Sequence, residues 1–212
     1  MTLSDWLSRN PLIAILRGLT PDEALPVAEV LAETGFRCLE VPLNSPRALE
    51  SITRIAREWG DGMLIGAGTV LRPEEARACV AAGGRIVVSP NTDASVIAAG
   101  VAAGAICLPG AATPTEAFAA LAAGAHGLKL FPAEAASPAV LKAWRAVLPA
   151  GTPVIPVGGI DAETMPPWRA AGAAGFGIGG SLYAPGRGLD EVRRRAEALQ
   201  AGLALTSGSG SA

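Results

Sequence analysis

The sequence predicts an α/β protein with the (β/α)8 TIM-barrel fold, and three observations lead to this prediction. Short apolar runs of strand type occur eight times along the 212 residues. An Ala-rich amphipathic stretch follows each run, and a glycine usually closes it. The runs begin 19 to 26 residues apart, which is the length of one strand, one helix and their connections. Eight such even units in so short a chain favour the barrel over a doubly wound open sheet.

Three prolines fall within the predicted strands, although proline cannot donate to the ladder of a central strand. We expect Pro42 and Pro109 near the C-terminal ends of their strands, while Pro156 is left without an explanation unless it marks a bulge. The predicted strands are LIAILRG (12–18), CLEVPLN (38–44), LIGAGTV (64–70), IVVSPN (86–91), AICLPGA (105–111), GLKLFP (127–132), PVIPVGG (153–159) and GFGIGGSLY (175–183).

Hydroxyl residues followed by proline mark four predicted helix starts. Each pair places a hydroxyl at the N-cap and proline at the first helical position, where its missing N–H costs nothing. Five glycines mark predicted helix ends, because glycine readily takes the left-handed conformation that closes a helix. The starts are Thr20-Pro21, Ser45-Pro46, Thr113-Pro114 and Ser137-Pro138, and the ends are Gly35, Gly83, Gly104, Gly124 and Gly172.

The composition excludes several classes of protein. The formal net charge is −2 without a strong basic cluster, so we expect no nucleic-acid partner. No apolar stretch reaches about 18 residues and no signal peptide is recognisable, so we expect neither a membrane partner nor export. The three cysteines lie far apart, without disulfide or metal spacing, which fits the cytoplasm.

We expect one domain over residues 1–205. The remaining residues, 206–212, are rich in Gly and Ser, and we interpret them as a flexible appended linker or tag remnant.

Alternation along the strands predicts which side chains face the barrel interior. Leu39 and Val41 should face the helices, which turns Glu40 inward, and Leu128 and Leu130 likewise turn Lys129 inward. The same reasoning turns Arg17 and Phe131 inward. In the third strand Thr69 shares a face with Ile65 and Ala67, and we place that face in the interior. Ionisable groups at the C-terminal ends of barrel strands point to an active site there, rather than to an ion pair that only holds the barrel together.

A buried lysine suggests covalent chemistry. Desolvation lowers the pKa of a lysine, and a neutral amine attacks carbonyls to form a Schiff base, which accepts electrons from an adjacent carbon–carbon bond. Glu40 would move the protons. A zinc-dependent alternative needs several imidazoles, whereas the chain has one histidine, His126, for which we expect a structural or surface role. We therefore predict no metal.

Glycines at the ends of the last two strands suggest a phosphate site. In this fold the loops after the seventh and eighth strands commonly bind phosphate through backbone N–H groups. Gly158-Gly159 and Gly179-Gly180-Ser181 occupy those positions, and Arg17 could add positive charge.

These motifs together resemble the 2-keto-3-deoxy-6-phospho-sugar-acid aldolases, the family of the phosphogluconate and phosphogalactonate aldolases. The resemblance runs from about Pro11 to Ala204 and rests on LIAILRG, LEVPLNSP, IGAGTV, VSPN, LPGAATPTEA, LKLFPAE, PVGGI and IGGSLY. It implies a class I aldolase, a homotrimer of barrels without metal or other cofactor. It also implies that Lys129 is the Schiff-base lysine, Glu40 the acid/base, Thr69 a contact to pyruvate, and Phe131 and Pro90 walls of the pocket. Arg17, Gly158, Gly159, Gly179, Gly180 and Ser181 match substrate and phosphate contacts of the family.

Two motifs favour one branch of this family. The phosphogluconate branch often carries LEVTLR and PTGG, where this chain has LEVPLN and PVGG. The latter forms are similar to the phosphogalactonate branch. We therefore expect cleavage of 2-dehydro-3-deoxy-6-phospho-D-galactonate to pyruvate and D-glyceraldehyde 3-phosphate, with the C4 epimer, the gluconate, as the alternative.

Two further alternatives stay open at this point. The Gly/Ser tail would also fit an aldolase-derived engineered assembly scaffold. Such a scaffold predicts abnormal apolar residues on outer helix faces or a lost lysine or glutamate, and a particle much larger than a trimer. Another phosphate-binding barrel, such as an isomerase, would not trap pyruvate with borohydride.

Overall fold

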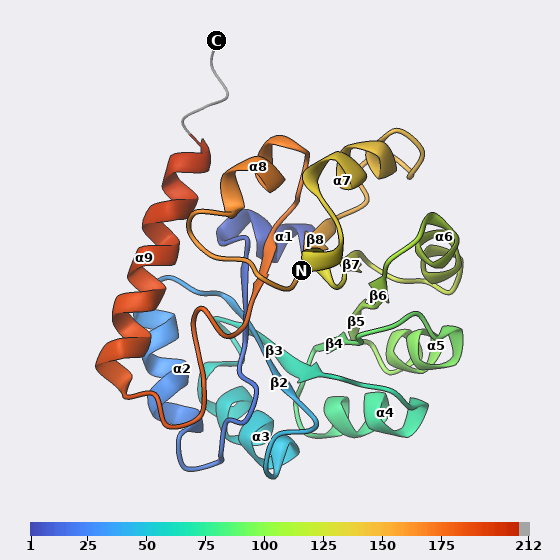
Figure 1. Ribbon diagram of the computed structural model, residues 1–212. Helices are drawn as coiled ribbons and strands as arrows, with labels where there is room; N and C mark the ends of the chain where they lie inside the picture. The colour runs from blue at the N-terminus through green and yellow to red at the C-terminus, as the bar shows by residue number, and fades with distance from the viewer. Residues whose placement is uncertain (208–212) are drawn as a thin grey trace.

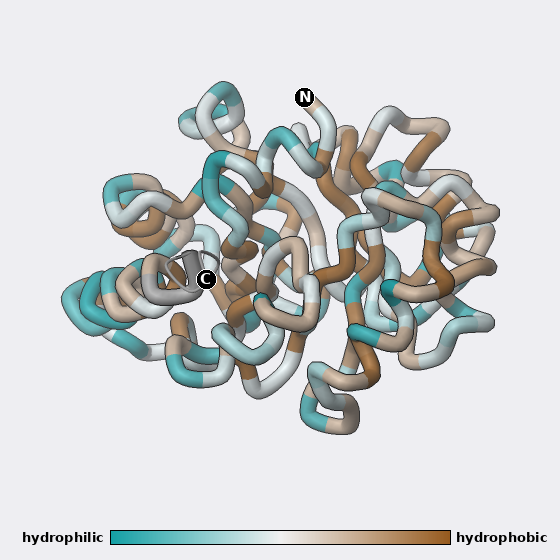
Figure 2. The backbone as a smooth tube through the Cα atoms, turned by 90° about the horizontal axis from the view of Figure 1, so that it is seen from above, coloured by the Kyte–Doolittle hydropathy of each residue, from teal (hydrophilic) through white to brown (hydrophobic). Residues whose placement is uncertain are grey.

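In a computed structural model, which describes residues 1–207, helices alternate with short parallel strands. The strands form a curled sheet at the centre, and the helices α2 to α9 surround it as a ring (Figure 1). Seen from above, apolar segments gather toward the inside of the chain and polar segments toward the outside (Figure 2). No helix in this part of the chain is long and apolar enough to cross a membrane.

Every predicted strand is present, but each is shorter than its apolar run. The fifth run is divided at Pro109, so the sheet has two hydrogen-bonded parts, with the orders β5-β4-β3-β2-β1-β9 and β6-β7-β8. All pairings are parallel, and a single bridge, Val157 to Gly177, links the end of β8 to β9. The strands are β1 Leu12–Ile15, β2 Cys38–Pro42, β3 Leu64–Gly68, β4 Ile86–Val88, β5 Ile106–Leu108, β6 Gly110–Ala111, β7 Leu128–Leu130, β8 Val154–Pro156 and β9 Phe176–Ile178.

The three prolines lie where the ladder does not need their missing N–H. Pro42 is the last residue of β2, and Pro109 follows the last residue of β5, as predicted. Pro156 needs no bulge. The carbonyl of Val154 accepts a hydrogen bond from Ala174, on the β9 side. Pro156 lies two residues further along β8, so its nitrogen faces the same side as the Val154 carbonyl. On that side β8 and β9 pair through the single bridge Val157–Gly177.

The helices end as predicted but do not all begin as predicted. All five predicted C-terminal glycines have φ between 85° and 99°. The helices are α1 Leu3–Arg9, α2 Ala24–Glu33, α3 Ala48–Trp59, α4 Pro73–Ala81, α5 Ala94–Ala102, α6 Pro114–Ala122, α7 Pro138–Arg145, α8 Met165–Ala170 and α9 Leu189–Ser207, with a 3-10 turn η1 at Ala133–Ala135.

Two of the four predicted N-caps are confirmed. Thr113 caps α6 in a capping box with Glu116, and Ser137 is the N-cap of α7. The other two predictions are wrong. Thr20 donates instead to the carboxylate of Glu23, the residue just before α2. Ser45 Oγ accepts a hydrogen bond from the N–H of Gly18. In both places the hydroxyl serves a loop rather than a helix end.

Two apolar clusters occupy the two faces of the sheet. The outer one joins Leu39, Val41, Leu128 and Leu130 to the helices, as the alternation predicts. The inner one contains Ile13, Ile15, Cys38, Leu64, Ile86, Val88, Ile106, Leu108, Ile155 and Val157.

Helix α1 covers the amino end of the inner cluster. Its Trp6 is 2% exposed, and the Arg9 and Arg85 guanidinium carbons lie 5.0 and 5.3 Å from the centroid of its ring. The opposite, carboxyl end of the strands is where the candidate site lies.

The predicted tail falls mostly beyond the described residues. Helix α9 extends to Ser207, two residues into the predicted tail, and residues 208–212 lie outside the described part of the chain. The expectation of a flexible linker therefore stays a prediction.

The capping box of α6 gives a prediction about stability. Thr113→Ala should lower the free energy of unfolding by about 1 kcal/mol, because the Glu116 N–H loses its acceptor. Ser137→Ala is the matched control, since Ser137 also precedes a proline but its side chain makes no cap hydrogen bond. Urea unfolding of both variants measures the difference. Equal losses at the two positions would contradict this account.

Candidate active site

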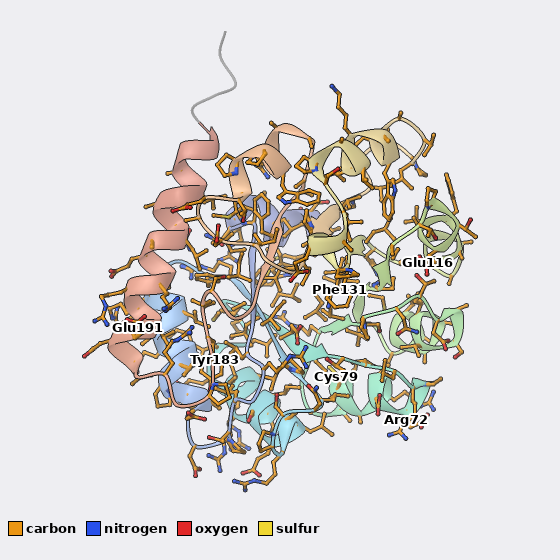
Figure 3. All side chains as sticks on the ribbon, in the orientation of Figure 1. Arg72, Cys79, Glu116, Phe131, Tyr183 and Glu191 are labelled. Carbon is orange, nitrogen blue, oxygen red and sulfur yellow. The ribbon has the colours of Figure 1, made fainter. Side chains whose placement is uncertain are left out.

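Glu40 and Lys129 lie at the middle of β2 and β7 and are almost completely buried. Glu40 is 2% exposed and Lys129 is 6% exposed. Their neighbours along each strand belong to the outer cluster, so both side chains face the interior, as predicted. Phe131, the next inward residue after Lys129, is half-buried against the inner cluster. Figure 3 shows Phe131 at the end of β7, near the centre of the ring of helices.

Burial controls the protonation of Glu40. Loss of water raises its pKa from 4.5 to about 7, and the nearby charges of Lys129 and Arg17 oppose this rise. Within residues 1–207, its Oε2 atom is buried without a hydrogen-bond partner. Gly68, on the adjacent strand β3, makes room for the carboxylate, because a Cβ at this position would overlap it. Glu40 therefore holds its proton to a higher pH than an exposed glutamate does.

Burial lowers the pKa of Lys129, whereas it raises the pKa of Glu40. Desolvation of the ammonium is the largest cause, the Glu40 carboxylate acts against it, and the Arg17 charge adds to it. Lys129 Nζ lies 4.5 Å from the centroid of the Phe131 ring, which forms part of its apolar wall. No ion pair within residues 1–207 includes Lys129 or Glu40. The two groups thus influence each other's charge without a salt bridge that would fix both as ions.

The glycine loops after β8 and β9 meet around a pocket of about 400 Å³ at the carboxyl end of the strands. The backbone N–H groups of Gly159, Gly180 and Ser181 donate to no acceptor within residues 1–207. The Ser181 hydroxyl already donates to the carbonyl of Ile160 at 2.7 Å. The pocket is lined by Ile15, Arg17, Glu134, Val157, Gly158, Gly159, Ile160, Asp161, Gly177, Gly179, Gly180 and Ser181.

Arg17 lies at the mouth of this pocket rather than in the interior. It follows β1, its side chain is exposed, and its Nη1 donates to Asn44 Oδ1 at 2.7 Å. Arg17 also lines a neighbouring pocket with Tyr183, Gly179 and Gly180. Its charge nevertheless reaches Glu40 and Lys129. This position is compatible with the prediction that Arg17 belongs to the site, although Arg17 lies two residues beyond the end of β1 at Ile15.

Thr69 and Pro90 follow β3 and β4, and neither lines the glycine-loop pocket. The prediction that Ile65, Ala67 and Thr69 share an inward face is wrong, since Ile65 and Ala67 belong to the outer cluster. Thr69 leaves this pattern because its φ is +55°, in the left-handed region that a β-branched residue rarely adopts. Such a backbone conformation is common where a structure holds a residue in place for function.

Sequence reasoning missed two residues of this region. Gly68 is needed beside Glu40, and only the glycine-rich run of β3 hinted at a close approach. Glu134 lines the pocket from η1, and its position depends on how the loops fold together, which no local pattern encodes.

The remaining lysine and the histidine lie elsewhere. Lys142 on α7 is exposed, as predicted. His126 is exposed, and its Nδ1 accepts a hydrogen bond from the N–H of Cys107, which supports the expected structural role. No group of three potential metal ligands from His, Cys, Asp and Glu occurs within residues 1–207.

Comparisons with known proteins agree on one family. The family model described as KDPG and KHG aldolase matches residues 3–193. The 2-dehydro-3-deoxy-6-phosphogalactonate aldolase of Escherichia coli (strain K12) is 46% identical over 194 residues, which cover 92% of this chain and 95% of the relative. A solved structure described as native KDPGal superposes with a TM-score of 0.93 and 43% identity, covering 98% of this chain and 99% of the other.

A more distant structure adds a chemical observation. It is the KDPG aldolase from Legionella pneumophila, with pyruvate captured at low pH as a covalent carbinolamine intermediate. It is 28% identical, with a TM-score of 0.82, and the match covers 94% of this chain and 98% of that one. The family match over most of the chain and the 46% identity to a full-length relative establish that this chain belongs to the KDPG and KHG aldolase family.

Proposed function

We propose that the protein is a class I aldolase that cleaves 2-dehydro-3-deoxy-6-phospho-D-galactonate to pyruvate and D-glyceraldehyde 3-phosphate. The observation that carries the proposal is the pair of buried groups whose pKa values move toward neutrality, Glu40 upward and Lys129 downward. The name of the relative with 46% identity supports the substrate. Glu40 and Lys129 are both present and buried, which argues against a scaffold that has lost one of them.

The reaction begins with the Lys129 amine. Its lone pair attacks the C2 ketone to give a carbinolamine, which loses water, with Glu40 as the proton donor, to give a protonated imine. The Glu40 carboxylate then takes the proton of the C4 hydroxyl. The C3–C4 bond breaks, its electron pair passes to the imine as an enamine, and glyceraldehyde 3-phosphate leaves. Protonation at C3 and addition of water release pyruvate and restore the amine.

The rim of the site holds the parts of the substrate that do not react. The free N–H groups of the loops at Gly158-Gly159 and Gly179-Gly180-Ser181, together with the Arg17 charge, support phosphate binding there. Phe131 supplies the apolar wall beside Lys129. Thr69 and Pro90, at the ends of the next strands, would contact the pyruvate portion and the pocket wall. Binding of the remote phosphate helps position the C3–C4 bond.

Three features of the whole molecule complete the proposal. The two parts of the sheet close into a full (β/α)8 barrel within one domain, with seams at Pro109 and at the Val157–Gly177 bridge. The protein acts as a homotrimer, which the exposed apolar side chains of Val101 on α5 and Phe118 on α6 support. Its three buried free cysteines support a cytoplasmic location.

Lys129→Ala should abolish both cleavage and pyruvate trapping. Borohydride reduces the imine to a stable amine, so mass spectrometry of the wild-type protein should show one pyruvate adduct on the peptide that contains residue 129. Lys142→Ala is the control, because Lys142 is an exposed lysine of α7, and it should keep the adduct. An adduct on Lys129→Ala protein would rule out the assigned nucleophile.

The raised pKa of Glu40 predicts a pH profile. Glu40 begins the cycle as a proton donor, so loss of its proton above about pH 7 should lower kcat/KM on the alkaline side. Protonation of Lys129 removes the nucleophilic amine and should lower kcat/KM on the acid side. Glu40→Gln should lower kcat by about 10²- to 10⁴-fold, the usual contribution of a general acid–base. Steady-state rates from pH 5 to about pH 9 measure both effects.

A stability measurement checks the same pKa independently of activity. The folded pKa of Glu40 exceeds the value of 4.5 expected when unfolded, so ionisation above that pH destabilises the wild-type fold. The stability gained by Glu40→Gln should therefore grow as the pH rises from 4.5 to about 7 and then level off. A constant difference between the two proteins would argue against a raised pKa.

The two C4 epimers test the substrate. Cleavage of 2-dehydro-3-deoxy-6-phospho-D-galactonate should have a higher kcat/KM than cleavage of the gluconate epimer, measured side by side through pyruvate release. A preference for the gluconate would retain the chemistry and overturn the substrate.

A further inference from the structure

The side chain of Glu134 lies against one of the two glycine loops of the pocket. It belongs to η1, the turn that follows the strand of Lys129, and its side chain reaches across to the loop after β8. A Cβ on Gly158 would overlap Glu134 Oε2, and a Cβ on Gly159 would lie 3.0 Å from Glu134 Cγ. The carboxylate therefore rests against the backbone that the proposed function assigns to phosphate.

The pocket is lined by two carboxylates, and they differ in how they are held. Asp161 Oδ1 accepts hydrogen bonds from the N–H groups of Glu163 and Thr164, at 3.0 and 2.8 Å, so it is tied to the start of α8. The Glu134 carboxylate has no hydrogen bond or ion pair within residues 1–207. Arg17, the cation that lines the pocket, binds Asn44 instead. Glu134 is an exposed side chain, so it is free to rotate away.

We propose that Glu134 is a specificity-determining residue that competes with the substrate phosphate for the Gly158-Gly159 loop. The proposal rests on the function proposed above. A phosphate and a carboxylate cannot occupy one place, and their like charges repel each other. Each conformer in which Glu134 covers the loop therefore lowers the apparent affinity for a phosphorylated ligand.

Competition of this kind affects only ligands that carry the phosphate. Substrate and glyceraldehyde 3-phosphate would both bind less tightly, so Glu134 speeds release of the phosphorylated product at the expense of substrate affinity. Pyruvate and acids without the phosphate would not be affected. Glu134 thus reduces the preference of the site for phosphorylated substrates.

Glu134→Gln tests this directly, because it removes the charge and keeps the shape of the side chain. We expect the KM for the phosphorylated substrate, and the Kd of inorganic phosphate measured by calorimetry, to fall about two- to tenfold. This range corresponds to a carboxylate that covers the loop for about half to nine tenths of the time. The gain should shrink at high salt, since exposed charges are screened.

The control variant is Glu163→Gln, the same change at an exposed glutamate two residues beyond Asp161 that does not line the pocket. It should leave the phosphate Kd unchanged. Borohydride trapping of pyruvate should be equal in the wild-type protein and in Glu134→Gln, because pyruvate carries no phosphate.

An unchanged or weaker phosphate affinity in Glu134→Gln would refute the competition, the latter showing that Glu134 supports the loop. Failure of the wild-type protein to trap pyruvate would instead refute the proposed function. The phosphate titration would still decide the role of Glu134, since it does not depend on turnover.

Discussion

The burial of one amine and one carboxyl group on the inner face of a parallel sheet is the constraint on which the site depends. Water is removed from both, so each resists ionisation, and each in turn favours the charge of the other. An ion pair in contact would have fixed Lys129 as a cation and Glu40 as an anion. The structure keeps them coupled without that contact, which leaves a nucleophilic amine and a carboxyl group able to give or take a proton.

Glycine makes this arrangement possible at two levels of the sheet. In the interior, Gly68 leaves space that the Glu40 carboxylate fills. At the rim, Gly158 and Gly159 adopt φ of 113° and 62° and leave their backbone open to an anion. In the proposed function, the apolar interior therefore holds the reacting groups, while the polar rim would bind the parts of the substrate that stay unchanged.

Local patterns predicted the fold well because alternation and helix ends are local properties. Leu39, Val41, Leu128 and Leu130 were placed correctly, and so Glu40 and Lys129 were too. Errors arose where distant segments meet. Ser45 binds Gly18, 27 residues away, instead of capping its helix, and the residues next to Ser45 in the sequence give no signal of this contact.

The candidate site also has features that the local sequence pattern does not predict. A left-handed φ at Thr69 turns the chain away from its strand pattern, and a threonine carries no signal for that conformation. The extent of strand pairing was also beyond the sequence, because it depends on seams at Pro109 and at one bridge.

The position of Trp6 beneath the strands bears on where substrate and products can enter and leave. Trp6 and the guanidinium groups of Arg9 and Arg85 cover the amino end of the inner cluster, whereas the glycine-loop pocket lies at its carboxyl end. In the proposed reaction, the substrate and both products would pass through these loops. The three-carbon fragment would stay bonded to Lys129 while the aldehyde departs, so the aldehyde would leave first.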